Sequence, residues 1–277
     1  MHKEITQDGA ALLAWYGEMG VDVALAETPA NRLAAPAADS AVRAEPPARP
    51  ETSAEAPPYR SSAPIPAITI PAATTTPAAA ERAASDAARG AATLEELREA
   101  LLRFDGCALS KTATQLVFSD GNPQARVMVV GEAPGRDEDI QGVPFVGRSG
   151  QLLNRMLAAI GLDRTSVYIA NVVPWRPPGN RTPTPQETAI CRPFITRQIE
   201  LCDPEILVCM GAPAAAELMN NTQGILKFRG QWKQFDTGTR KIRAIATLHP
   251  AYLLRQPLQK RLAWRDFLQL REAIAAL

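Results

Sequence analysis

Four short apolar runs, separated by segments with helical spacing, constrain the fold of this chain more than any other feature. The runs are ARVMVV (residues 125–130), SVYIAN (166–171), EILVCMG (205–211) and IRAIATLHP (242–250). The helical segments between them are SGQLLNRMLAAIG (149–161), TPQETAICRPFITRQIEL (184–201) and APAAAELMN (212–220). Continuous apolar strands that alternate with helices are typical of a parallel sheet covered on both faces. The sequence therefore predicts a three-layer α/β/α sandwich around a central, mainly parallel four-stranded sheet.

The folded domain is predicted to occupy residues 89–277. Eleven of the 24 prolines lie between Pro29 and Pro77, in a segment made mainly of Ala, Pro, Ser and Thr. Such a segment has too little large apolar surface to offset chain entropy, which predicts a disordered linker over residues 23–88. Residues 1–22 are predicted to contain a short helix that binds an unknown protein partner.

Charge is unevenly distributed along the chain. The net charge is only +1, but residues 221–277 contain eleven Lys and Arg against three acidic residues. A local basic excess of this kind suits a phosphate-rich partner or a solvated helix face. No apolar run approaches the ~18 residues needed to cross a bilayer, and the first residues lack the features of a secretory signal. A cytoplasmic protein without membrane contact is expected.

Three polar residues follow three of the apolar runs. Glu132, Asn171 and His249 each come at the carboxyl end of a predicted strand, so all three are expected at the same edge of the sheet. Each one alone has an ordinary structural explanation, but their shared placement favours a site. The segment GEAPGRDED (131–139) lacks the glycine spacing of phosphate-binding loops, and its carboxylates would repel a phosphate. Carboxylates near a developing sugar cation or an attacking water suit hydrolysis at a sugar carbon.

Four motifs carry a resemblance to a known family. They are GEAPGRDED (131–139), GVPFVGRSGQLL (142–153), NVVPWRPPGNRTPTPQE (171–187) and HPAYLLR (249–255). In this order they resemble family 4 of the uracil-DNA glycosylase superfamily, and the resemblance spans residues 95–275. It implies a repair enzyme that flips uracil out of DNA and hydrolyses the N-glycosidic bond, leaving an abasic site. Whether other deaminated bases are accepted stays open.

The resemblance also implies roles for individual residues. Glu132 and Glu138 are expected to position water and stabilise the sugar cation, and His249 to contact O2 of the base. Phe145 is expected to stack on the flipped base and Asn171 to read its edge. The residues expected to bind the base are Gly131, Ala133, Phe145 and Asn171.

DNA contacts are expected within the last motif and at basic residues before and after it. Leu253, Leu254 and Arg255 would enter the minor groove as a wedge. The side chains expected to contact phosphates are Arg148, Arg181, Lys260, Arg261 and Arg265. The expected partner is uracil-containing DNA, bound by a monomeric protein of bacterial type that associates with the nucleoid.

The chain departs from the family at its cysteines. Members of family 4 typically bind a [4Fe–4S] cluster through four cysteines, and Cys107 and Cys191 stand at two of these positions. Phe104 and Trp175 replace the other two. Two thiolates do not hold a cluster that needs four. The sequence therefore predicts no cluster, no other metal and no cofactor, with both aromatic side chains packed in the vacated volume.

Two alternative functions stay open. One is a protein that binds uracil in DNA without turnover or stays covalently attached. The covalent variant of the superfamily carries an Arg-rich, His-bearing insertion after its first motif, and GRDEDIQGVPFVG (135–147) has none. The other alternative is a polymerase-associated scaffold recruited through residues 1–22, which would keep its partner after loss of Glu132 and His249.

Overall fold

The computed structural model describes residues 76–277. The predicted helix within residues 1–22 and most of the predicted linker lie outside the described residues. The helices are α2 (Pro77–Gly90), α3 (Leu94–Arg103), η1 (Ala108–Lys111), α4 (Arg136–Gln141), α5 (Arg148–Ala158), η2 (Pro178–Asn180), α6 (Pro185–Cys202), α7 (Ala212–Met219), α8 (Ile225–Phe228), α9 (Pro250–Arg255), η3 (Pro257–Gln259) and α10 (Lys260–Ala275). The strands are β1 (Asp120–Gly121), β2 (Val127–Gly131), β3 (Tyr168–Asn171), β4 (Ile206–Met210), β5 (Trp232–Asp236) and β6 (Lys241–Thr247). Among the described helices, none has the length and apolar character needed to cross a membrane.

The sheet contains six strands in the order β1-β3-β2-β4-β6-β5. The four central strands are parallel, and β1 and β5 pair antiparallel at the two edges. The predicted four-stranded parallel sheet is thus confirmed as the centre, while the two edge strands were not predicted. Gly131 pairs with Asn171, and Met210 pairs with Thr247. The carboxyl ends of β2, β3, β4 and β6 therefore form one edge of the sheet.

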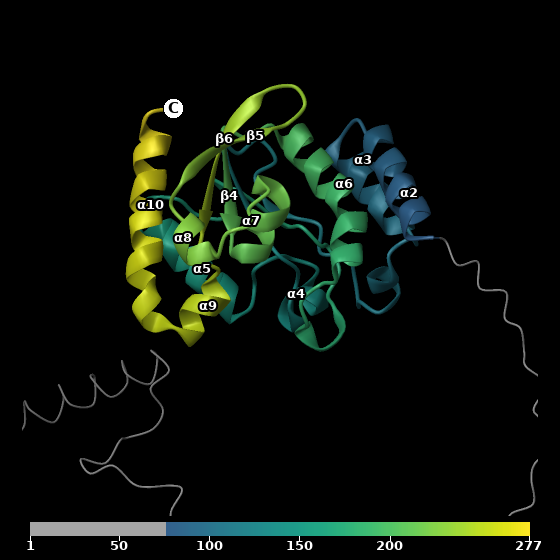
Figure 1. Cartoon of the computed structure of the whole chain (residues 1–277), viewed down its shortest axis with the longest axis horizontal. Helices are drawn as coiled ribbons and strands as arrows, with labels where there is room; N and C mark the ends of the chain where they lie inside the picture. The colour runs from purple at the N-terminus through teal and green to yellow at the C-terminus, as the bar shows by residue number, and fades with distance from the viewer. Residues whose placement is uncertain (1–75) are drawn as a thin grey trace, which may run out of the picture. The chain divides into compact units, whose positions relative to one another are not determined.

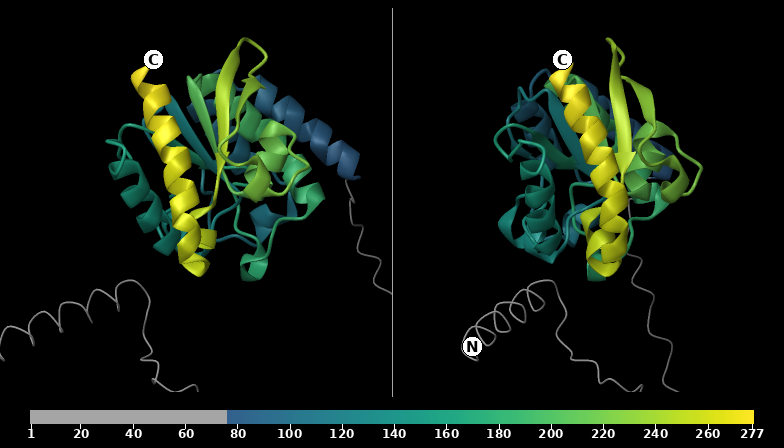
Figure 2. Two further views of the ribbon diagram at one scale, coloured as in Figure 1. Left: turned by 60° about the vertical axis from the view of Figure 1, so that its left-hand side comes forward. Right: turned by 90° about the vertical axis from the view of Figure 1, so that its left-hand side faces the viewer.

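Helices cover both faces of the sheet, which confirms the three layers (Figure 1). Alternate residues of each central strand point to opposite faces. Val127 and Val129 belong to a core shared with α5 and α10, whereas Met128 and Val130 belong to a core shared with α2, α3, α6 and α7. Figure 2 shows α10 and the sheet from two further directions. The polar site residues can therefore lie only where the strands end.

Helix α2 corrects the predicted domain boundary. Residues 77–88 were predicted as part of a linker, but Pro77–Gly90 forms a helix that packs against α6. Ala80, Ala84 and Ala88 are buried on one face of it. Alanine has the highest helix propensity, and a stripe of methyl groups lets two helices approach closely. The described domain therefore begins with α2 rather than at residue 89.

Candidate active site

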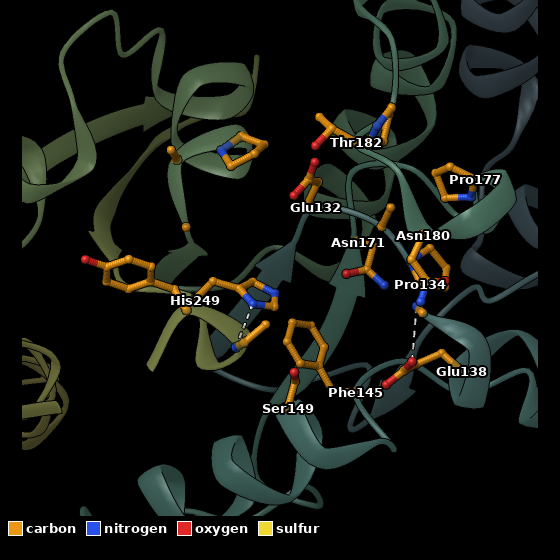
Figure 3. Close-up of a pocket in the computed structure, with 18 of the residues that line it drawn as sticks. Glu132, Pro134, Glu138, Phe145, Ser149, Asn171, Pro177, Asn180, Thr182 and His249 are labelled. Carbon is orange, nitrogen blue, oxygen red and sulfur yellow. Dashed lines mark hydrogen bonds between the residues drawn. The ribbon is translucent and has the colours of Figure 1, made fainter. Parts of the chain in front are cut away.

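A pocket of about 550 Å³ opens at the carboxyl edge of the sheet. Glu132 follows β2, Asn171 ends β3, and His249 follows β6, and all three line this pocket together with Phe145. Figure 3 shows these four side chains around the same hollow. The structure thus brings together the residues that the sequence placed at one sheet edge.

Asn171 offers a free acceptor in the pocket. The side chain is 5% exposed, and its buried Oδ1 atom has no hydrogen-bond partner. Gly131 lies opposite on β2, where an added Cβ would come within 2.5 Å of Asn171 Oδ1 and 2.6 Å of Phe145 Cζ. Only glycine lets the amide and the ring approach the strand this closely. Ala133 also lines the pocket.

His249 is held as a neutral hydrogen-bond donor. It is the N-cap of α9, and its Nδ1 atom accepts a hydrogen bond from the backbone N–H of Ala251 at 3.1 Å. Burial, with a smaller contribution from the Arg255 cation, lowers the pKa of His249 to about 4. Because Nδ1 is an acceptor in a neutral ring, the proton lies on Nε2. The ring centroid is 5.5 Å from that of Phe145, with 31° between the planes.

The state of His249 predicts how stability depends on pH. Its folded-state pKa of about 4 lies below the unfolded value of 6.5, so the unfolded chain binds more protons between these values. The contribution of this pKa shift to the free energy of unfolding is therefore fully present above about pH 6.5. Roughly 3 kcal/mol of it is lost as the pH falls to 4. Urea unfolding at pH 7 and pH 4.5 measures this loss. It should be smaller in His249→Gln, and an equal loss in the variant would contradict the assignment.

Glu132 has a carboxyl group that the fold leaves incompletely paired. Its Oε1 atom is buried without a hydrogen-bond partner. Burial raises the pKa of Glu132, and a hydrogen bond with Thr182 partly opposes this effect. Thr182 was not predicted as a site residue, although it lies within the motif at residues 171–187. A buried carboxyl oxygen without a partner at a pocket wall is suited to a ligand that carries positive charge or a water molecule.

Glu138 lines the pocket, but its carboxylate is already occupied. It is 8% exposed, and it accepts hydrogen bonds from the backbone N–H groups of Gly135 at 3.1 Å, Val146 at 3.0 Å and Gly147 at 3.0 Å. A carboxylate that is satisfied by three amides has little capacity left for water. The geometry therefore favours a role in fastening the loop that carries Phe145 over the predicted role in positioning water.

The predicted phosphate contacts differ in how available they are. Arg148 at the start of α5 is exposed, as are Arg255 and Arg261, and Lys260 is half-buried. Arg181 lines the pocket but forms a two-pronged ion pair with Glu187, with distances of 2.7 and 2.8 Å. This pair raises the pKa of Arg181 and lowers that of Glu187 to about 2. Arg181 therefore lies at the pocket rim, but its guanidinium is already paired with Glu187 of α6.

The predicted wedge is only partly accessible. Leu253 is 1% exposed and packs in a small core with Leu248 and Ala263, so its predicted insertion into DNA was wrong. Leu254 is half-buried. Leu258, in the following turn, is 84% exposed and was not predicted. In the sequence, the preceding Pro257 and the following Lys260 and Arg261 could have indicated that Leu258 is exposed.

The two cluster-position cysteines lie in an apolar environment. Cys107 and Cys191 are fully buried in the same core. A hydrogen bond with Cys191 lowers the pKa of the Cys107 thiol, and the same contact raises the pKa of Cys191. Trp175 is 4% exposed, and Phe104 packs edge-on against Phe194 with ring centroids 5.1 Å apart. Within residues 76–277, no group of three or more His, Cys, Asp or Glu is placed to hold a metal ion. This set of side chains does not fit a four-thiolate cluster.

The fold agrees with comparisons to known proteins. A model of the uracil DNA glycosylase superfamily matches residues 118–268, and the chain belongs to this superfamily. A type-4 uracil-DNA glycosylase from Archaeoglobus fulgidus is 40% identical over 183 residues, which cover 65% of this chain and 92% of the relative. Another from Thermotoga maritima is 42% identical over 163 residues, or 58% of this chain and 83% of the relative. A third, from Sulfurisphaera tokodaii, is 38% identical over 184 residues, or 65% of this chain and 84% of the relative.

Proposed function

We propose that this protein is a DNA repair hydrolase of the type-4 uracil-DNA glycosylase kind, which removes uracil from DNA and leaves an abasic site. The observation that carries the proposal is the pairing of an unsatisfied acceptor with a neutral donor in one pocket. Asn171 Oδ1 is buried without a partner, and His249 presents Nε2–H beside the ring of Phe145. A flat base with alternating donors and acceptors completes this arrangement.

Base recognition follows from the chemistry of one amide. The Oδ1 atom of Asn171 accepts from N3–H of uracil, and its NH2 group donates to O4. Cytosine presents an amine and an unprotonated nitrogen at these positions, which would leave buried polar groups unpaired at a cost of about 1–3 kcal/mol each. Phe145 covers one face of the base. The nucleotide has to leave the helical stack to reach the pocket.

The reaction separates charge between the sugar and the base. As the bond from C1′ to N1 lengthens, the sugar becomes cationic and the uracil ring becomes anionic. His249 Nε2–H donates to O2, and this hydrogen bond strengthens as O2 gains charge, which lowers the barrier. The Glu132 carboxylate stabilises the sugar cation and orients the water that attacks C1′. The proton that this water loses passes to solvent, which also protonates the departing uracil anion. Glu138 holds the Phe145 loop.

DNA contacts are proposed along the exposed surface beside the pocket. Arg148, Arg255, Lys260 and Arg261 would bind phosphates, which position the strand without reading its sequence. An apolar side chain is needed to fill the space that the flipped nucleotide leaves. Leu258 is the most exposed large apolar side chain of the described residues, which makes it, with the half-buried Leu254, the proposed wedge.

Base release tests the proposal directly. Oligonucleotides containing uracil, hypoxanthine, xanthine or only normal bases are incubated with the whole protein, and alkali-induced strand breaks report abasic sites. Breaks at uracil, lost in Asn171→Ala and His249→Ala, support the assignment. A shift that resists denaturation would instead mean covalent trapping. Absence of any base release by the intact protein would mean that the pocket binds without catalysis.

We also propose that the domain works without an iron–sulfur cluster. Support comes from the four positions involved, where two buried thiols stand beside two buried or half-buried aromatic rings. The expected result is full uracil release by protein that contains far less than one iron per chain. Iron analysis and the visible absorption spectrum measure this after purification without oxygen. Iron near four atoms per chain would overturn the proposal.

A further inference from the structure

Phe145 has a backbone conformation that its residue type disfavours. Its φ angle is +55°, in the left-handed region that bulky side chains rarely occupy. The ring is nevertheless 5% exposed and turned toward His249 and Gly131. Surrounding contacts must therefore hold this backbone in place, because the residue itself would relax to another conformation.

Arg164, in the loop between α5 and β3, supplies one side of this restraint. Its guanidinium donates to the backbone carbonyl of Pro144 at 2.7 Å and to that of Phe145 at 2.9 Å. It also donates to Asn154 Oδ1 at 3.2 Å and to Asp120 Oδ2 at 2.7 Å. The planar guanidinium can satisfy several acceptors in fixed directions, whereas an ammonium group acts as a point charge.

Asp120 connects this guanidinium to the sheet. It belongs to β1, which pairs with β3, and its carboxylate lies 2.6 Å from Arg164 Nη2. The side chains of Arg164 and Asp120 are 23% and 34% exposed. The two-residue edge strand thus has a use beyond its small contribution to the sheet, because it anchors the cation that holds the Phe145 loop.

Two further contacts restrain the same loop from other directions. The Glu138 carboxylate accepts from the amides of Val146 and Gly147, so an anion holds the N–H groups just after the carbonyls that the cation holds. Gly150 of α5 lies directly against Phe145, since an added Cβ would come within 1.7 Å of the Phe145 carbonyl oxygen. The backbone of Phe145 therefore has little room to move while Arg164 stays bound.

We propose that Arg164, anchored by Asp120, is a positioning residue that holds Phe145 in its left-handed conformation so that the ring faces the flipped base. This inference rests on the proposed glycosylase function. Arg164 does not line the pocket, and it acts on the base only through Phe145. Its removal should therefore affect catalysis without removing any contact to DNA.

Arg240 offers a matched control with similar chemistry outside the pocket. Its guanidinium donates to Asp203 Oδ1 at 2.7 Å and to the carbonyls of Asp203 and Pro204 at 3.0 and 3.1 Å. It precedes β6 at the end away from His249 and does not line the pocket. Removing either arginine breaks a short carboxylate contact and two carbonyl contacts. Arg164 also loses its contact with Asn154, and Arg240 loses a 4.0 Å contact with Glu205, but only Arg164 holds Phe145.

A double-mutant cycle tests the inference with single-turnover uracil release. Arg164→Ala is expected to slow release by on the order of 10- to 100-fold, since small misplacements of a substrate-positioning group have effects of this size. In a Phe145→Ala background the same change should alter the rate by less than about 2-fold, because coupled residues are not additive. Arg164→Lys should lose part of the rate, and Arg240→Ala should keep the parental rate.

Amide hydrogen exchange gives a readout that does not depend on activity. The N–H groups of Val146 and Gly147 should exchange at least about 10-fold faster in Arg164→Ala and unchanged in Arg240→Ala, since local opening controls exchange. The inference would be overturned if Arg164→Ala left the exchange of these two N–H groups unchanged. It would also be overturned if Arg164→Ala slowed uracil release by the same factor in the parent protein and in the Phe145→Ala variant. If the parent protein released no uracil, the proposed function would fail, while the exchange experiment would still decide whether Arg164 holds the loop.

Discussion

Replacing Glu132 with glutamine is expected to slow uracil release by on the order of 10²- to 10³-fold and, at neutral pH, to stabilise the domain. The rate falls because a neutral amide cannot stabilise the sugar cation. Stability rises because burial raises the pKa of Glu132, so the folded domain loses stability as the pH rises through that pKa and the carboxyl ionises. The melting temperature is therefore expected to rise. Differential scanning calorimetry and single-turnover kinetics measure the two effects.

Asp266→Asn is the matched control for this variant. Burial also raises the pKa of Asp266, but its carboxylate is paired with Arg229 and accepts from the Thr247 hydroxyl. Removing this charge leaves Arg229 without its partner, so the control should melt at a lower temperature while the rate per folded molecule is unchanged. A lower melting temperature for Glu132→Gln as well would show that the Glu132 carboxylate is paired in the folded protein.

Asn171→Asp is expected to reduce uracil release by at least about 10²-fold, because a site built to bind one hydrogen-bond pattern rejects a mismatch strongly. The substitution keeps the shape of the side chain but replaces the NH2 donor with a second acceptor, which repels O4 of uracil. The ratio of the uracil release rate to the cytosine release rate should also fall in this variant. Single-turnover assays on matched oligonucleotides with uracil or cytosine at one position measure both rates.

Asn221→Asp controls for the effect of a new carboxylate on the fold. The Asn221 side chain is buried and bonds only to the backbone of Gln223, outside the pocket. This variant is expected to lose some stability and to keep its preference for uracil. If Asn171→Asp released uracil at the parental rate, the base would be read by another residue.

The central part of the fold was predictable because its strands are buried on both faces. β2, β3, β4 and β6 appear in the sequence as continuous apolar runs, and the polar residues that end three of them could be placed at one edge by topology alone. β5 escaped prediction because Lys233, Gln234 and Asp236 are exposed, so the strand is not a continuous apolar run. β1 has only two residues, too few for any pattern.

The remaining differences arise from contacts that no local pattern encodes. Alanine-rich α2 was taken for a linker, because composition does not reveal that α6 offers a surface for its methyl groups. Glu138 was predicted to act in catalysis because the sequence shows its position in the motif. The sequence does not show that three backbone N–H groups donate to its carboxylate, since these contacts form only in the folded chain. Arg164 lies outside every motif, and only the structure shows which carbonyls it binds.

The neutral imidazole of His249 has a consequence for repeated cycles of the enzyme. A ring whose pKa is about 4 is neutral at neutral pH, and a neutral imidazole is too weak an acid to give its Nε2 proton to the base. In the proposed mechanism the pyrimidine therefore leaves as an anion and is protonated by solvent. The imidazole therefore ends each proposed event with the same proton that it held at the start. It is ready for the next lesion without having to recover a proton.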